Sequence, residues 1–152
     1  MKDLGAANYI LGMEIKRDRV KRKLWLNQRK YVETILQRFN MQDSKPGNVP
    51  IPVGVKLSDE QYPKTHEEEE YMSRVPYASV VGSLMYAMVC TRPAIAHLVG
   101  VLSRFMSNPG KEHWIAVKRV FRYLHSTSDY VLCYQRRPRL ERMLDIHAFV
   151  DA

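Results

Sequence analysis

A proline-rich stretch divides this 152-residue sequence into two parts. Residues 43–65 hold four prolines and two glycines, a density that is incompatible with the interior of a helix or a sheet. We therefore expect an extended linker or surface loop there. The acidic run EEEEY at 67–71 follows, and because glutamate is favoured in the first turn of a helix, a helix is expected to begin there.

Residues 1–42 have the pattern of a β-hairpin followed by a helix. Apolar side chains alternate along residues 9–15, and a second short strand covers 23–26, so the basic run KRDRVKRK between them is the expected hairpin tip. Asn27 is a favourable N-cap for a helix over 28–39, where apolar residues recur at helical spacing.

Three amphipathic helical patterns joined by short turns follow the linker, at 77–90, 94–106 and 111–125. They indicate a small helical bundle over 71–128.

Two last apolar runs, at 130–135 and 143–152, predict a pair of strands over 129–152. The expected fold class is therefore α+β. It comprises an N-terminal β-hairpin plus helix, a Pro-rich and acidic linker over 43–70, a central three-helix bundle and a C-terminal β-hairpin.

Charge is unevenly distributed along the chain, whose formal net charge is +8. Residues 16–30 carry eight Lys or Arg against one Asp, whereas residues 59–70 carry six acids against one Lys. A basic surface suits a polyanion, although two solvated charged segments account for the composition equally well. The candidate nucleic-acid contacts are the basic side chains of the hairpin and of the third bundle helix: Lys16, Arg17, Arg19, Lys21, Arg22, Lys23, Lys111, Lys118, Arg119 and Arg122.

Aromatic side chains that could stack on bases accompany these cations, with core packing as the alternative role: Trp25, Tyr31, Tyr123 and Tyr130.

The usual catalytic and metal-binding patterns are absent from the sequence. Asp145 and Asp151 would lie about 20 Å apart along one strand, too far to share a metal ion. The five histidines have no zinc spacing, and neither a Gly-x-Ser-x-Gly elbow nor a glycine-rich phosphate loop occurs. We expect no metal and no cofactor, buried free thiols at Cys90 and Cys133, and neither a signal peptide nor a membrane span.

The order of several phrases resembles a known family. They are MKDLGAANYILGMEI, LWLNQRKYVETILQRFNM, VPYASVVGSLMYAMVCTRP, SRFMSNPGKEHWIAVKRVFRYL and FVDA. Together they resemble the Pol polyprotein of copia-type retrotransposons, from the end of the reverse transcriptase palm to the opening strand of ribonuclease H. The resemblance implies a primer-grip-like hairpin and helix over 1–42, a thumb- and connection-like bundle over 71–128, and truncated first strands of a ribonuclease H-like domain over 129–152.

Asp151 matches, by the same resemblance, the first metal-binding aspartate of ribonuclease H. The other acids of that site and the polymerase aspartates are expected outside this sequence, so both active sites would be incomplete, Asp151 vestigial and the chain not an enzyme. Where the family has glycine, this chain has Ser126, Val131 and Ala148. We expect backbone strain at those of the three positions where the glycine served a positive φ or close packing.

Three interpretations remain open. The first is a non-catalytic fragment derived from a retrotransposon reverse transcriptase and ribonuclease H. It would lie in the cytoplasm or nucleus, bind a DNA or RNA duplex or hybrid electrostatically, and self-associate through apolar faces made for the palm.

The second interpretation is a secreted RxLR-type effector that acts on a host protein inside a plant cell to suppress immunity or cell death. It rests on the resemblance of short copia-like fragments to such effectors, although the sequence has no Arg-x-Leu-Arg motif. The third is one segment of an unsplit polyprotein.

Overall fold

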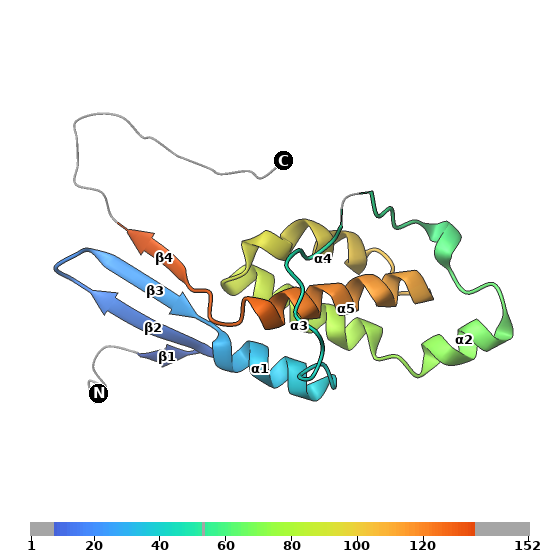
Figure 1. Cartoon of the computed structure of the whole chain (residues 1–152), viewed down its shortest axis with the longest axis horizontal. Coiled ribbons are helices and arrows are strands. Elements are labelled where there is room, and N and C mark those ends of the chain that lie inside the picture. Colours follow the sequence, from blue (N-terminus) through green and yellow to red (C-terminus); the bar gives the residue numbers. More distant parts are fainter. Residues whose placement is uncertain (1–7, 53, 136–152) are drawn as a thin grey trace, which may run out of the picture.

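The computed structural model describes residues 8–52 and 54–135, which form a small sheet joined to a helical body (Figure 1). The strands are β1 (Tyr9–Ile10), β2 (Met13–Asp18), β3 (Lys23–Asn27) and β4 (Leu132–Gln135). The α-helices are α1 (Arg29–Arg38), α2 (His66–Ser73), α3 (Tyr77–Cys90), α4 (Ala96–Ser103) and α5 (Lys111–Ser126). Two 3₁₀ helices, η1 (Asp59–Gln61) and η2 (Pro93–Ile95), precede α2 and α4. The α+β fold class predicted from the sequence is confirmed.

The sheet begins with a tight turn that the sequence pattern did not indicate. Leu11 and Gly12 connect β1 to β2, and both have positive φ, 49° and 75°. Two consecutive residues of positive φ are typical of the two-residue turns that join antiparallel strands. The expectation of one continuous strand over 9–15 is therefore wrong. The Tyr86 hydroxyl donates to the Leu11 carbonyl and so attaches this turn to α3.

The strand β4 completes the sheet, whose order is β1-β2-β3-β4. It pairs antiparallel with β3, placing Cys133 opposite Trp25 and Tyr134 opposite Leu24. The partner expected for β4 was the run at 143–152, which lies outside the described residues. Segments more than a hundred residues apart thus form neighbouring strands.

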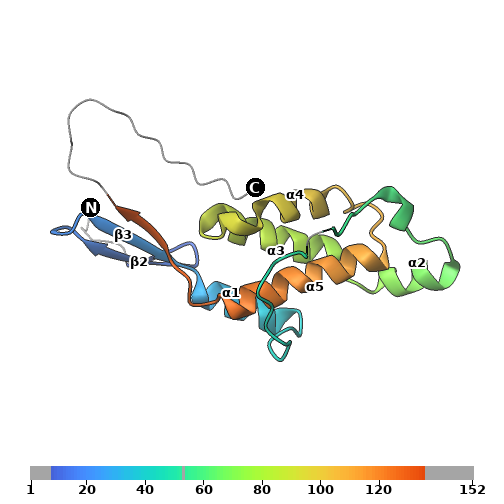
Figure 2. The same cartoon turned by 45° about the horizontal axis from the view of Figure 1, so that its top comes forward.

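The hydrophobic core lies between α1, α3, α4 and α5 (Figure 2). Each of these helices contributes fully buried side chains, represented by Val32, Leu84, Val99 and Phe121. Burial of one such side chain contributes about 1.5–3 kcal/mol. Because α1 is part of this core and follows β3 directly, the sheet is fixed to the helical body.

The start of α1 lies one residue later than expected. Gln28 occupies the N-cap position, so the prediction that Asn27 is the N-cap is wrong. Asn27 is the last residue of β3, and its Oδ1 still accepts the backbone N–H of Arg29 at 2.8 Å.

The proline-rich segment crosses the surface of α5. The Gly47 N–H donates to the Arg122 carbonyl at 3.0 Å, and the Ser126 hydroxyl donates to the Gly47 carbonyl at 2.6 Å. Ser126 and Val131 are not among the described residues with positive φ, so strain from a left-handed backbone does not occur at these two positions. Ala148 lies outside the described residues.

The acidic helix α2 lies at the end of the molecule opposite the sheet (Figures 1 and 2). It begins at His66, close to the position predicted, and Thr65 caps it by accepting the N–H of Glu68 at 3.3 Å. None of the described helices combines the length and the apolar character that membrane crossing requires.

Candidate nucleic-acid interface

The hairpin tip, defined here as residues 16–23, is the most basic part of the described chain, with six Lys or Arg and one Asp. β2 and β3 hold it in register, with Asp18 opposite Lys23, so that a four-residue turn over 19–22 closes the hairpin. The Asp18 carboxylate accepts the N–H of Lys21 at 2.8 Å, and Arg22 has a φ of 52°. The turn therefore has a defined backbone geometry, which fixes the positions of the Cα atoms of its arginines.

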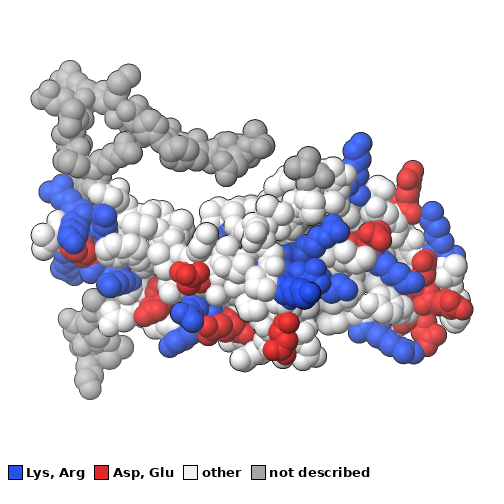
Figure 3. Space-filling model, viewed as in Figure 1, with Lys and Arg blue, Asp and Glu red and all other residues white. Residues whose placement is uncertain are grey.

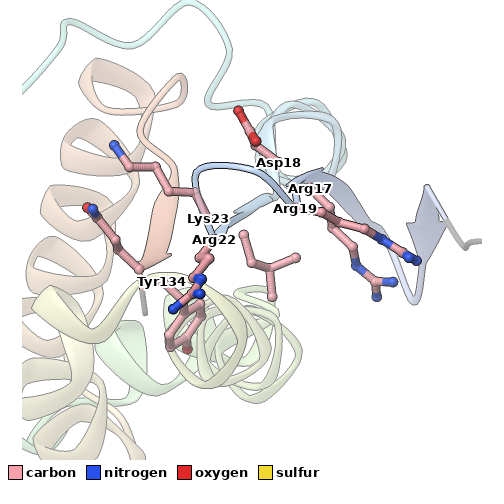
Figure 4. Close-up of a pocket in the computed structure, with 8 residues that line it drawn as sticks. Arg17, Asp18, Arg19, Arg22, Lys23 and Tyr134 are labelled. Atoms are coloured by element: carbon pink, nitrogen blue, oxygen red, sulfur yellow. The ribbon is translucent and has the colours of Figure 1, made fainter. Parts of the chain in front are cut away.

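An open hollow of about 730 Å³ lies at the hairpin tip (Figure 4). Residues from β2, the turn, β3 and β4 line it: Arg17, Asp18, Arg19, Arg22, Lys23, Leu24, Tyr134 and Gln135. Four of the predicted contacts thus meet at one site, and two residues of β4 complete it. Tyr134 was missed by the sequence reasoning because its place depends on the β3–β4 pairing, which carries no local signal.

Lys16 belongs to a different face of the sheet. Successive side chains of a strand alternate between faces, so Lys16 projects away from the face of Arg17. It lines a smaller hollow of about 280 Å³ together with Glu14, Trp25, Asn27 and Val131. Lys21 is exposed in the turn and does not line either hollow.

The four predicted contacts on α5 are separate from the hairpin tip. Figure 3 shows basic side chains at the sheet end and, apart from them, over the helical body; one group of carboxylates lies at the far end, and others lie between the two ends. Lys111 lies at that far end, where its Nζ is 3.7 Å from the Glu68 carboxylate and 5.8 Å from the centre of the Tyr71 ring. The acidic helix therefore partly neutralises Lys111 and not the hairpin.

The other cationic residues of α5 are less available than those of the hairpin tip, because neighbouring groups contact or partly bury them. Lys118 Nζ lies 5.9 Å from the centre of the Trp114 ring, and both Lys118 and Arg119 are half-buried. Arg122 is exposed, but its backbone carries the hydrogen bond from Gly47. These side chains form a weaker candidate surface than the hairpin tip.

The aromatic side chains proposed for stacking differ in exposure. Tyr31 is half-buried and packs against the core; its hydroxyl donates to the Ser83 carbonyl at 3.0 Å, and burial raises its pKa. Trp25 and Tyr123 are half-buried, whereas Tyr130 is exposed. Tyr134, which has 54% of its surface exposed, is the aromatic residue that lines the basic hollow.

Among the described residues, no group of three or more His, Cys, Asp or Glu side chains could hold a metal ion. Cys90 and Cys133 are free thiols, but Cys90 is half-buried and Cys133 is exposed, so the expectation that both are buried is wrong. Asp145 and Asp151 lie outside the described residues, so the role predicted for Asp151 stays a prediction.

The sequence matches Pol polyproteins of transposons. The Pol polyprotein of the transposon TNT 1-94 from Nicotiana tabacum is 60% identical over 134 residues, which is 88% of this chain. That of the transposon RE1 from Arabidopsis thaliana is 37% identical over 152 residues, the full chain. This chain is a relative of copia-type Pol polyproteins. It spans about 10% of the length of each of these two polyproteins.

A partial match links the same sequence to another class of protein. The secreted RxLR effector protein 161 of Plasmopara viticola is 57% identical over 65 residues, 43% of this chain and 46% of the effector. No family model matches the sequence. No solved structure matches it. The resemblance to copia-type Pol polyproteins that the sequence predicted is thus confirmed, and a shorter effector match accompanies it.

Proposed function

We propose that this part of the Pol-related chain is a non-catalytic nucleic-acid contact that binds the phosphate backbone through the hairpin tip. The observation that carries the proposal is that Arg17, Arg19, Arg22 and Lys23 all line one open hollow at the hairpin tip. Among the described residues, no salt bridge involves a Lys or Arg of the hairpin tip. Arg17, Arg19 and Arg22 are exposed, which favours contact with an external anion.

The physical basis of such binding is counterion release. Each phosphate that a Lys or Arg neutralises frees condensed cations, so the logarithm of the binding constant falls with the logarithm of salt concentration by about 0.9 per neutralised phosphate on duplex DNA. Phosphate contacts carry no sequence information. The proposal therefore predicts binding that depends steeply on salt concentration and not on base sequence. The compartment proposed for this binding is the cytoplasm or nucleus.

The test is fluorescence anisotropy of labelled DNA duplexes and RNA–DNA hybrids of two unrelated sequences, titrated with the purified chain at several salt concentrations. Similar affinities for both sequences and a steep decrease with salt are expected. Absence of binding at low salt would contradict the proposal. Incorporation of nucleotides or cleavage of the hybrid in the presence of Mg²⁺ would contradict its non-catalytic part.

The effector match favours a second candidate function, in which the chain acts on a host protein inside a plant cell. The observation behind it is the 57% identity over 65 residues to a Plasmopara viticola protein described as a secreted RxLR effector. Expression in plant cells challenged with an elicitor of cell death separates the two candidates. An effector would reduce cell death, whereas a nucleic-acid contact of a transposon protein would leave it unchanged.

A further inference from the structure

We propose that the hollow at the hairpin tip takes a single unpaired nucleotide of a nucleic-acid strand, with the base against Leu24 and Tyr134 and the phosphate among the arginines. This inference rests on the proposed nucleic-acid binding and specifies which form of nucleic acid the site prefers. It depends on the geometry of three neighbouring strands and on the turn between β2 and β3.

The apolar part of the site is a row of cross-strand partners. Arg17 of β2 is opposite Leu24 of β3, which is in turn opposite Tyr134 of β4. Directly opposed residues have side chains on the same face of the sheet, with Cβ atoms about 4.5–5.5 Å apart. The exposed Tyr134 ring and the half-buried Leu24 side chain therefore form adjoining apolar surface beside a guanidinium group.

The charged part of the site surrounds this apolar surface. In Figure 4, Arg22 lies beside Tyr134, whereas Arg17 and Arg19 extend together on the other side of the hollow. A guanidinium group presents its donors in a planar fork that matches phosphate oxygens. Phosphate is therefore the anion that suits the arginines, and a planar ring is the group that suits Tyr134.

Asp18 is the one carboxylate that lines the hollow. It points away from Arg22 and Tyr134 in Figure 4, and its Oδ1 accepts the N–H of Lys21. Because strand residues alternate between faces, Asp18 lies on the opposite face of β2 from Arg17. The carboxylate stabilises the turn and leaves the face of Tyr134 to the arginines.

An unpaired nucleotide fits this combination better than a base pair does. Inside a duplex both faces of each base are covered by neighbouring bases, whereas an unpaired base can stack on an aromatic side chain. The hollow, about 730 Å³, is large enough for one nucleotide, since pockets of about 300–1,000 Å³ hold ligands of this size or larger. The base pairs inside a duplex would reach the arginines with their phosphates and leave the Tyr134 ring without a stacking partner.

The test compares three labelled DNAs on the full chain by fluorescence anisotropy: a blunt duplex, the same duplex with one unpaired terminal nucleotide, and the same duplex ending in an abasic unpaired sugar phosphate. Base stacking on an aromatic side chain is worth enough to raise affinity about tenfold. We expect the duplex with the unpaired nucleotide to bind about tenfold more tightly than the other two DNAs.

Two variants of Tyr134 assign that difference to the ring. Tyr134→Phe keeps the aromatic face, so the preference for the unpaired nucleotide should remain. Tyr134→Leu keeps an apolar strand residue but removes the ring, so the preference for the unpaired nucleotide should disappear. Lys64→Gln, which removes one charge near the acidic helix α2, is the control and should leave the preference intact.

The outcomes separate this inference from the proposed function. Equal binding of all three DNAs by the unmodified chain would overturn the inference and leave the phosphate-contact function standing. A preference that persists in Tyr134→Leu would also overturn it. Failure to bind any of the three DNAs at low salt would overturn both.

Discussion

The Thr91 hydroxyl donates a hydrogen bond of 2.6 Å to the side-chain Oε1 of Gln28, joining residues that are 63 positions apart in the sequence. Gln28 is fully buried at the start of α1, and Thr91 is buried at the end of α3. Arg92, also buried, donates to the Ser128 carbonyl at 3.1 Å, and burial lowers its pKa. These contacts join the beginning of α1, the end of α3 and the segment after α5.

Thr91→Val should destabilise the fold by about 1–3 kcal/mol, because it leaves the buried Gln28 acceptor without a donor. Thr34→Val is the matched control: the Thr34 hydroxyl bonds only within the exposed face of α1, so its removal should change stability by no more than about 0.5 kcal/mol. Urea unfolding of both variants measures the difference. Equal destabilisation by the two substitutions would mean that the buried hydrogen bond contributes no more to the free energy of unfolding than the exposed one does.

Gly110→Ala should also destabilise the protein, by about 1–3 kcal/mol. The reason is a steric clash, since a Cβ at Gly110 would lie 1.7 Å from the Gln61 carbonyl oxygen of η1. Gly100→Ala provides the control, because nothing lies within 4 Å of a Cβ at that position in α4. There the change should stabilise by about 0.5–1 kcal/mol through helix propensity. Thermal unfolding should therefore show opposite shifts, and a stabilised Gly110→Ala would contradict the packing.

His113 should make stability fall at acid pH. Its ring is fully buried and stacks on Phe105 at 4.0 Å between centres, and its Nδ1 accepts the N–H of Gly110 at 2.9 Å. Burial lowers the pKa of His113, an effect opposed by the Ser58 backbone and by the nearby carboxylates of Asp59 and Glu112. Protonation would place a charge in the interior and a second donor against the Gly110 N–H.

The direction of the pH dependence follows from the difference in proton binding between the folded and unfolded chain. The unfolded chain, with a His pKa of about 6.5, binds the proton more readily than the folded chain does. The contribution of His113 to stability is therefore complete above about pH 6.5 and is lost as the pH falls through the lower folded pKa. In urea unfolding between neutral and mildly acidic pH, His113→Gln should lose less stability than the unmodified chain. Parallel pH profiles would show that His113 does not titrate with unfolding.

Self-association remains a prediction, and α3 offers a surface for it. Val89 and Met85 lie one helical turn apart with 76% and 39% of their surfaces exposed. Val89→Lys should shift the chain towards monomer in sedimentation velocity, because it places a charge within this apolar surface. A monomer at all concentrations before the substitution would contradict the expectation.

Local sequence patterns predicted the helices that neighbouring residues in the sequence specify. The apolar spacing of Val32, Ile35 and Leu36 identified α1, and the glutamates after Thr65 identified α2. The turn at Leu11 was not predictable, since leucine has no preference for positive φ and only tertiary contacts such as that with Tyr86 fix it there.

The candidate site was predictable only in part. The run KRDRVKRK identified the basic hairpin tip directly. The contribution of Tyr134 required the pairing of β4 with β3, and the neutralisation of Lys111 required the position of Glu68, and both are contacts between distant parts of the chain. Charge composition therefore indicated the kind of ligand, whereas the fold separated the hairpin tip from α5.

The most direct test of nucleic-acid binding by the hairpin tip is the salt dependence of duplex binding in two variants, each with three fewer positive charges. One carries Arg17→Gln, Arg19→Gln and Arg22→Asn at the hairpin tip, with asparagine chosen because it tolerates the positive φ of Arg22. The other carries Lys118→Gln, Arg119→Gln and Arg122→Gln on α5.

We expect the hairpin variant to lower the slope of log affinity against log salt by about 2–3, at about 0.9 for each phosphate that is no longer neutralised, and the α5 variant to lower it by less than about 1. Equal changes in the two variants, or a larger change in the α5 variant, would contradict the assignment of nucleic-acid binding to the hairpin tip.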